Sequence, residues 1–240
     1  MSLAPSRSDP ALAFALAGEA LEARPSGALW WPAQGLLAVS DLHLGKSERI
    51  ARRGGTLLPP YETQATLDRL GEEIAATGAR TVLCLGDSFD DLAAAALPEA
   101  EAGRLAALMA GRRWLWIEGN HDPGPVGLGG EHLAELRAGP LVFRHEAAVP
   151  RAEGDAPAAV ATAEAGAGEV SGHYHPKARL RGGWRRCFVL APPRLILPAF
   201  GRYTGGLDVG SGPLRRVAPR GLALIAGARV VAAPLERLRG

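Results

Sequence analysis

Short apolar runs recur along the first 145 residues, and each of them ends at polar or charged positions. The runs are residues 36–40, 81–85, 114–117 and 141–143. Short apolar runs that are bounded by glycine and polar residues are typical of strands buried inside a protein. The pattern therefore predicts four buried strands whose carboxyl ends carry polar side chains.

Two segments between these runs repeat their apolar residues at helical spacing. Residues 62–77 place leucine and isoleucine on one face and are followed by Gly78, which predicts the end of a helix. Residues 99–110 predict a second helix, ended by Gly111. The alternation of strand and helix favours an α/β architecture.

The pattern changes in the second half of the chain. Residues 151–168 are rich in alanine, glycine and acidic residues without periodicity, and predict a loop. Short predicted strands separated by glycine and proline turns follow at residues 187–190, 194–197, 222–225 and 229–232. The sequence contains no internal repeat, and we interpret residues 1–240 as a single domain.

Composition excludes several classes of protein. With 240 residues, of which 47% are hydrophobic and 22% are charged, the chain can bury a substantial core and is neither disordered nor a coiled coil. The most apolar segment, residues 222–235, is interrupted by Gly227, Arg229 and Pro234, so no membrane helix is expected. Residues 11–17 resemble a signal peptide only faintly, because Asp9 lies where positive charge is expected.

These features predict a cytoplasmic protein without a membrane partner. Cys84 and Cys187, 103 positions apart, form neither a disulfide framework nor a zinc pair, so both are expected to be reduced.

Charge is distributed unevenly along the chain, although the net charge is only +2. Residues 171–240 contain 13 Lys and Arg against Asp208 and Glu236, a charge of +11, whereas residues 1–170 carry −9. A GC-rich genome accounts for 25 Arg against two Lys but not for the scarcity of acidic residues after position 170. The basic segment therefore favours an anionic partner such as nucleic acid.

The candidate chemistry lies in short motifs, most of which follow the apolar runs. In chain order they are Asp41-Leu42-His43, Gly86-Asp87, Gly119-Asn120-His121-Asp122, a separate His145, and Gly172-His173-Tyr174-His175. Residues spaced i, i+2 at the tip of a strand point to the same side, so the Asp-x-His and His-x-His pairs each offer two ligands to one cavity. Imidazole, carboxylate and amide groups without thiolate suit Mn, Fe, Zn or Ni, and argue against a closed structural zinc site.

Asp-x-His and Gly-Asp are weak signals alone, whereas Gly-Asn-His-Asp is rarer and Gly-His-x-His is stronger. The order of these motifs resembles that of the calcineurin-like metallophosphoesterases. Within that family, several segments are similar to the ligase-associated DNA damage response endonucleases of bacteria (PdeM type). These segments are residues 41–47, 172–176, 186–189, 197–201 and 204–207. The resemblance covers nearly the whole chain. It departs at Asp90, near which many relatives have a histidine, and at residues 151–168, which are longer than expected.

The resemblance implies a fold and a set of ligands. The fold would be a four-layer α/β/β/α sandwich of two mixed sheets flanked by helices, with the metal site at the strand ends. Two divalent metal ions are implied, manganese first and zinc, iron or nickel as alternatives. The first ion would be held by Asp41, His43 and His175, the second by Asn120, His145 and His173, with Asp87 bridging both and His121 facing the substrate as a catalytic residue.

The implied function is hydrolysis of phosphodiester bonds by a hydroxide that bridges the two ions, in DNA during repair. His121, when protonated, would stabilise or protonate the leaving oxygen. A DNA ligase and other repair enzymes encoded nearby are the implied protein partners.

Two other functions stay open. One is a phosphodiesterase or phosphatase acting on a nucleotide or another small phosphate ester, because the same core serves both substrate classes. The other is a nucleic-acid-binding or scaffold protein with a vestigial site, against which the seven intact candidate ligands argue. Salt-sensitive affinity for polynucleotide would distinguish a nuclease from an enzyme acting on small molecules.

Two sets of basic residues are candidate substrate contacts. Lys46, Arg49, Arg52 and Arg53 follow the first motif, and Arg179, Arg181, Arg185 and Arg186 lie within a dozen residues of His175. Either set could instead be solvated, the second through surface salt bridges with the surplus acids of residues 1–170. His132, beside Glu131 in a helical pattern, is interpreted as a surface residue without a role.

Overall fold

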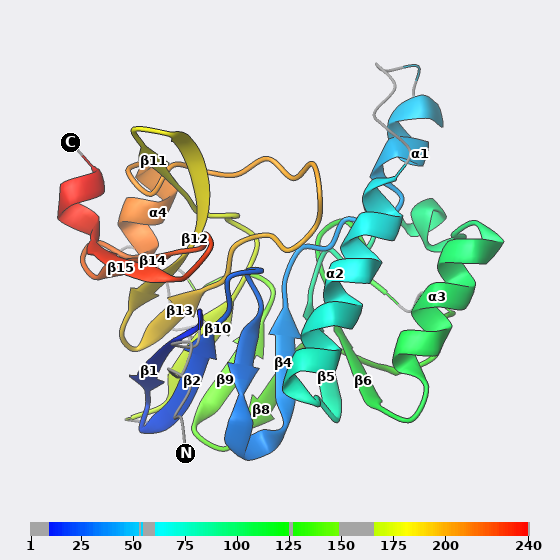
Figure 1. Ribbon diagram of the computed structural model, residues 1–240, viewed down its shortest axis with the longest axis horizontal. Helices are drawn as coiled ribbons and strands as arrows, with labels where there is room; N and C mark the ends of the chain where they lie inside the picture. The colour runs from blue at the N-terminus through cyan, green and yellow to red at the C-terminus, as the bar shows by residue number, and fades with distance from the viewer. Residues whose placement is uncertain (1–9, 53, 55–60, 125–126, 149–165, 240) are drawn as a thin grey trace, which may run out of the picture.

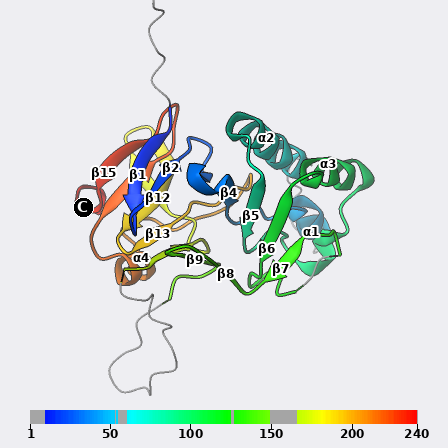
Figure 2. The same cartoon turned by 90° about the horizontal axis from the view of Figure 1, so that it is seen from below.

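Two β-sheets pack face to face in the computed structural model, and helices cover both outer surfaces (Figures 1 and 2). The structure describes residues 10–52, 54, 61–124, 127–148 and 166–239. The order of layers is helix, sheet, sheet and helix, which confirms the predicted α/β/β/α sandwich.

The first sheet has seven strands in chain order, and its strands β4 to β7 run parallel to one another. Strand β1 pairs antiparallel with β2, β2 with β3, and β3 with β4. The strands are β1 (Leu12–Leu16), β2 (Glu19–Ala23), β3 (Leu29–Trp31), β4 (Leu36–Val39), β5 (Thr81–Leu85), β6 (Arg113–Ile117) and β7 (Glu131–Leu133).

The second sheet has the order β15-β14-β12-β13-β10-β9-β8, and β11 pairs with β12 as a hairpin. Within it, β10 runs parallel to both β9 and β13. Its strands are β8 (Glu135–Ala138), β9 (Leu141–Arg144), β10 (Gly168–Ser171), β11 (Lys177–Leu180), β12 (Gly183–Ala191), β13 (Arg194–Ile196), β14 (Leu222–Ile225) and β15 (Val231–Pro234).

Helices α2 (Glu62–Thr77) and α3 (Glu99–Met109) cover the outer face of the first sheet, and α4 (Gly212–Val217) lies on the far side of the second (Figure 2). Helix α2 ends where the sequence predicts, because Gly78 adopts a left-handed conformation with φ of 65°. The remaining helical segments are α1 (Lys46–Arg52), η1 (Pro32–Gln34), η2 (Leu92–Ala95) and η3 (Leu235–Leu238).

Three apolar layers hold the sandwich together, because central strands bury both of their faces. On β5, Leu83 and Leu85 point between the sheets, whereas Val82 and Cys84 pack beneath α2 and α3. On β12, Phe188 points between the sheets while its neighbours pack toward α4. Strands buried on both faces read as continuous apolar runs, which explains why the sequence pattern located them. Both cysteines are free and buried.

Several predicted elements differ from the structure. Residues 11–17 contain β1, which pairs with β2, and sequence analysis missed both strands. His132 lies on β7 rather than in a helix, and its ring stacks against that of Trp116, with centroids 6.3 Å apart. The predicted loop at residues 151–168 lies mostly outside the described residues, and Gly168 already belongs to β10. The last predicted strand starts two residues later, at Val231. No helix in the described part of the chain is long and apolar enough to cross a membrane.

Candidate metal centre

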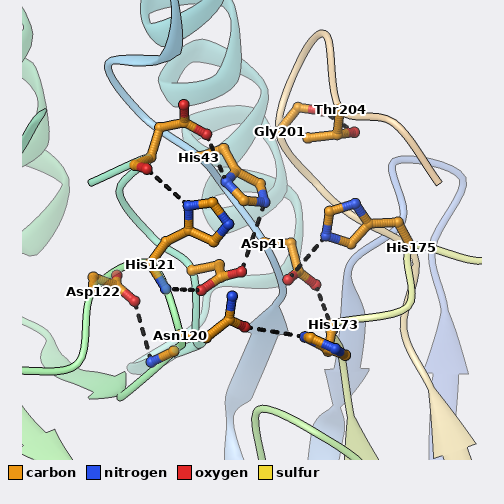
Figure 3. A network of polar contacts seen from close by, with 12 residues as sticks. Asp41, His43, Asn120, His121, Asp122, His173, His175, Gly201 and Thr204 are labelled. Carbon is orange, nitrogen blue, oxygen red and sulfur yellow. Dashed lines mark hydrogen bonds and ion pairs between the residues drawn. The ribbon is translucent and has the colours of Figure 1, made fainter. Parts of the chain in front are cut away.

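The candidate ligands come together at one edge of the sandwich, where parallel strands of both sheets end (Figure 3). Asp41 follows β4, Asp87 follows β5, and Asn120 follows β6 in the first sheet. His145 follows β9 and His173 follows β10 in the second sheet. Because the carboxyl ends of parallel strands meet at the same edge, residues far apart in the sequence share one site.

The backbone at this edge is strained. Seven described residues other than glycine have a positive φ, and five of them are candidate ligands: Asp41, His43, Asp87, His173 and His175. A left-handed conformation is costly for residues with a side chain and persists only where the surrounding structure holds it. Bonds between loops supply that support, since the amide of His43 donates to the carbonyl of Asp87 at 2.9 Å and that of Gly172 to the carbonyl of His145 at 2.8 Å.

A first group of ligand atoms is formed by Asp41, His43 and His175. Nε2 of His175 lies 3.1 Å from Oδ1 of Asp41, and all three ligand atoms lie within 4.8 Å of one another. Apart from this approach, Asp41 Oδ1, His43 Nε2 and His175 Nε2 are buried and have no hydrogen-bond partner among the described residues. Buried polar atoms without partners are rare, and their convergence on one point fits a bound cation.

A second group lies beside the first and contains His145, His173 and Asn120. Nε2 of His145 and Nδ1 of His173 are 3.2 Å apart, and the side-chain oxygen of Asn120 lies 2.9 Å and 3.1 Å from them. Two imidazole nitrogens and an amide oxygen in this arrangement match the ligand preferences of transition metals.

Asp87 lies between the two groups. Its Oδ2 is 3.5 Å from Nε2 of His145 and 3.9 Å from Nε2 of His43, and its Oδ1 accepts a hydrogen bond from the amide of His121. Burial opposes ionisation, but these contacts outweigh it and lower the pKa of Asp87 to about 2. Burial also opposes the charged form of His145 and by itself would lower its pKa. The contacts with the carboxylates of Asp87 and Asp41 outweigh burial and raise the pKa of His145 to about 9.

Asp90, at the position where a histidine is expected in relatives, orients the first group. Its buried Oδ1 lies 2.9 Å from Nδ1 of His43, which directs the other ring nitrogen of His43 to the site. Arg49 pairs with the same carboxylate, and Nζ of Lys46 lies 4.0 Å from it. The structure thus places these two candidate substrate contacts beside the centre with Asp90 as their partner.

Asp122 connects two of the loops, a role that sequence analysis did not assign. Its buried carboxylate accepts hydrogen bonds from the amides of Ser88, Phe89 and Gly119 at 2.7, 3.1 and 3.1 Å. Burial, together with the charge of Asp87, raises the pKa of Asp122 to about 6. The signal for this role was its place in the motif of residues 119–122.

At two motif positions, Gly119 and Gly172, neighbouring loops approach so closely that there is no room for a side chain. A Cβ at Gly119 would lie 2.2 Å from the amide nitrogen of Asp87. At Gly172, it would lie 1.7 Å from Oγ of Ser40 and 2.6 Å from Oδ2 of Asp41. Each glycine therefore packs against a loop that carries a candidate ligand from another motif.

His121 faces the same site from a different direction. Its ring is 5.1 Å from that of His43, and its Nδ1 lies 2.9 Å from the carbonyl oxygen of Asp90. A carbonyl can only accept, so this Nδ1 carries a proton and donates it. In neutral His121, Nε2 is then left without a proton. A third possible ligand group combines His121 with His43 and Asp87.

Of the other candidate substrate contacts, the structure describes the side chains of Arg179, Arg181, Arg185 and Arg186. Arg53 and the side chain of Arg52 lie outside the described residues. Arg179, Arg181 and Arg185 are exposed on the β11–β12 hairpin. Arg186 differs, because its guanidinium donates to the carbonyls of Phe200 and Gly201. None of the four arginines of the second set forms an ion pair with a carboxylate of the described residues.

Comparisons with known proteins agree with this geometry. The family model of calcineurin-like phosphoesterases matches residues 36–190, a range that contains every candidate ligand. The crystal structure of Pseudomonas putida nuclease MPE resembles the chain with a TM-score of 0.69 and 27% sequence identity, covering 93% of this chain and 100% of that one. No curated protein sequence matches the chain.

Proposed function

Because the chain belongs to the calcineurin-like phosphoesterase family, we propose that it is a DNA nuclease that uses two divalent metal ions. Its family, its likeness to a nuclease and its clusters of histidine and aspartate identify it as a metal-dependent phosphoesterase. The number of ions, their identity and the DNA substrate are the proposed part.

One observation carries the proposal of two ions: two groups of ligand atoms lie on either side of a single carboxylate, Asp87. Asp41, His43 and His175 would hold one ion, and Asn120, His145 and His173 the other. Manganese fits this mixed set of nitrogen and oxygen ligands, as do zinc, iron and nickel. Such ions, when bound, lower the pKa of water and neutralise charge on the phosphate oxygens.

The protein's own residues would position and protonate the reacting groups. His121 donates through Nδ1 to the carbonyl of Asp90, so a protonated His121 would offer its Nε2 proton to the leaving oxygen. Asp90 orients His43, and Asp122 fixes the loops that carry Asp87 and Asn120. These contacts prepare the site before a substrate binds.

DNA is the proposed substrate for two reasons. A solved structure with 27% sequence identity is a nuclease, and residues 171–240 carry a charge of +11. The exposed hairpin arginines have no described carboxylate as partner and are free to contact phosphates. A role in DNA repair, alongside a DNA ligase and other repair enzymes, rests on the sequence resemblance alone.

A pocket beside the centre favours a second candidate, a nucleotide or another small phosphate ester. The pocket has a volume of about 340 Å³ and is lined by His173, Tyr174, Leu207 and Arg216, among others. Glu146 also lines the pocket, but its size and the presence of Arg216 beside apolar side chains suit a mononucleotide.

One set of assays separates these candidates. The metal-loaded protein is given bis(p-nitrophenyl) phosphate, p-nitrophenyl phosphate and covalently closed plasmid DNA, each with Mn²⁺, Zn²⁺ or Mg²⁺. We expect hydrolysis of the diester, nicking of the plasmid and two metal ions per chain. Hydrolysis of small esters without nicking would favour the second candidate, and the absence of any hydrolysis in a metal-loaded protein would overturn both.

A further inference from the structure

A basic pocket that the proposed reaction does not use lies between the β2–β3 turn, helix α2, strand β12 and the loop after β13. Its volume is about 460 Å³. Its lining includes three arginines, Arg69, Arg186 and Arg202, and two aromatic residues, Trp184 and Tyr203. We call it the basic aromatic pocket.

Three arginines crowd together in this pocket. Burial, followed by repulsion from Arg186 and Arg202, lowers the pKa of Arg69 to about 10. Nε and Nη2 of Arg69 are buried, and no described residue forms a hydrogen bond with them. Among the described carboxylates, Glu73 and Glu72 act on Arg69 only at longer range, and Glu73 pairs directly with Arg24. Arg69 also lies over the ring of Phe200, 4.2 Å from its centroid, but like charges that are held together without a carboxylate partner favour the binding of an anion.

Two aromatic side chains are exposed at the same pocket. Trp184 is 50% exposed and Tyr203 is 43% exposed. Trp184 and Arg186 are two residues apart on β12, so they lie on the same face of the strand. Tyr203 directly follows Arg202 and has a positive φ of 43°. Exposed aromatic rings beside arginines are the combination with which proteins bind unpaired nucleotides.

The pocket is connected to the metal centre by the loop after β13. Arg186 donates to the carbonyls of Phe200 and Gly201, and the amide of Gly201 donates to the carbonyl of Asp41. Nearer the centre, Nζ of Lys177 donates to the carbonyl of Thr204 at 3.0 Å. Figure 3 shows Gly201 and Thr204 beside His43 and His175. A strand crossing the centre would therefore meet the same loop that shapes the pocket.

We propose that the basic aromatic pocket binds one unpaired nucleotide of a polynucleotide that extends from the metal centre. The exposed Arg202 would contact its phosphate, Arg69 and Arg186 would add positive charge from beneath, and Trp184 and Tyr203 would stack on its base. This inference rests on the proposed function for the choice of a polynucleotide. If the pocket binds a nucleotide in this way, the protein should prefer DNA with unpaired bases. The metal centre alone does not predict this preference.

Binding measurements on the metal-loaded protein test the pocket directly. Fluorescence anisotropy compares a 12-nucleotide phosphorothioate oligothymidylate, which resists hydrolysis, with an abasic oligomer of equal length. We expect the oligothymidylate to bind about tenfold more tightly, because only it offers bases for stacking. The double variant Trp184→Ala, Tyr203→Ala should lose this difference, whereas Trp184→Phe, Tyr203→Phe should keep it.

A charge variant tests the phosphate contact. Arg202→Gln should weaken the binding of both oligomers by similar factors and reduce the slope of affinity against salt by about 0.7. Arg220→Gln removes an exposed arginine outside the pocket and serves as the matched control, with no change expected. Hydrolysis of bis(p-nitrophenyl) phosphate should stay within about twofold in every variant, which also shows that each one is folded.

The outcomes separate this inference from the proposed function. Equal binding of the two oligomers by the wild type, or an unchanged preference in the double alanine variant, would overturn the pocket even if the protein nicks plasmid DNA. A preference that is lost in the double alanine variant, in a protein that nicks no DNA, would overturn the nuclease function and retain the pocket.

Discussion

The metal centre and the β11–β12 hairpin are both rich in charged groups, but they hold them in opposite ways. At the centre, buried carboxylates and imidazoles converge, and neighbouring loops fix their backbones. On the hairpin, the exposed Arg179, Arg181 and Arg185 have no carboxylate partner among the described residues. The first arrangement fixes distances of a few ångströms, whereas the second creates a field that acts at longer range and is screened by salt.

This comparison predicts that variants of the two regions fail differently. A change at the centre should affect metal binding, turnover or folding and should do so with every substrate. A change on the hairpin should affect only long anionic substrates.

Replacement of Asp87 by alanine should have the largest effect on activity. Its carboxylate lies between both ligand groups, so its loss removes one ligand from each proposed ion. We expect turnover of bis(p-nitrophenyl) phosphate to fall by about 10³-fold or more, and the metal content to fall with it. Elemental analysis and circular dichroism check metal content and folding. Two ions per chain with near wild-type turnover would remove Asp87 from its proposed position.

Replacement of His121 by alanine should lower turnover and leave the metal content unchanged. Its proposed role is to protonate or stabilise the leaving oxygen, and removal of such a group costs about 10²–10⁴-fold. The comparison of turnover with metal content in the same preparation is the measurement. Loss of one ion would show instead that His121 is a ligand, as its group with His43 and Asp87 would also allow.

Replacement of Asp122 by alanine should act mainly on stability. Three buried amides would lose their acceptor, and unsatisfied buried groups cost roughly 1–3 kcal/mol each, with partial compensation by water. We expect the free energy of unfolding in urea to fall by about 2–5 kcal/mol. Asp68→Ala is the control, because Asp68 is half exposed and pairs with Arg104 at the surface. A change there should be roughly 0–1 kcal/mol. Equal effects of the two substitutions would contradict the connecting role of Asp122.

Sequence reasoning located the strands and helices that bury continuous or periodic apolar faces. Strand β5 and helix α2 have the predicted bounds, because the first is buried on both faces and the second ends at a left-handed glycine. Strands β1 and β2 were missed, because they alternate between exposed and buried positions over only five residues each. His132 was misplaced in a helix, because β7 is three residues long and is defined by its partner strand.

The candidate ligands were recognisable because they follow those strands within short motifs. The residues that position them were not, because their partners are distant in the sequence. Asp122 bonds to amides 33 and 34 positions away, and Arg49 reaches Asp90 across 41 positions. Such pairs form only after the sheets have brought the loops together, so the motifs mark Asp122 and Arg49 as candidates but composition and spacing do not identify their partners.

The smallest expected effect concerns the arginines of the β11–β12 hairpin, whose removal should leave the metal centre unchanged. Sequence analysis grouped four arginines near His175, but Arg186 bonds to the loop after β13, which also contacts Asp41. The triple variant Arg179→Gln, Arg181→Gln, Arg185→Gln therefore leaves Arg186 in place and removes the surface charge of the hairpin, including Arg185, which also lines the basic aromatic pocket. Three lost phosphate contacts would reduce the slope of log affinity for single-stranded DNA against log salt by about 2. Affinity should fall about tenfold at low salt, whereas hydrolysis of bis(p-nitrophenyl) phosphate should change by less than about twofold, because hydrolysis of that small diester depends on the metal centre alone. An unchanged salt slope would show that the hairpin does not contact phosphate and would favour a small phosphate ester as the substrate.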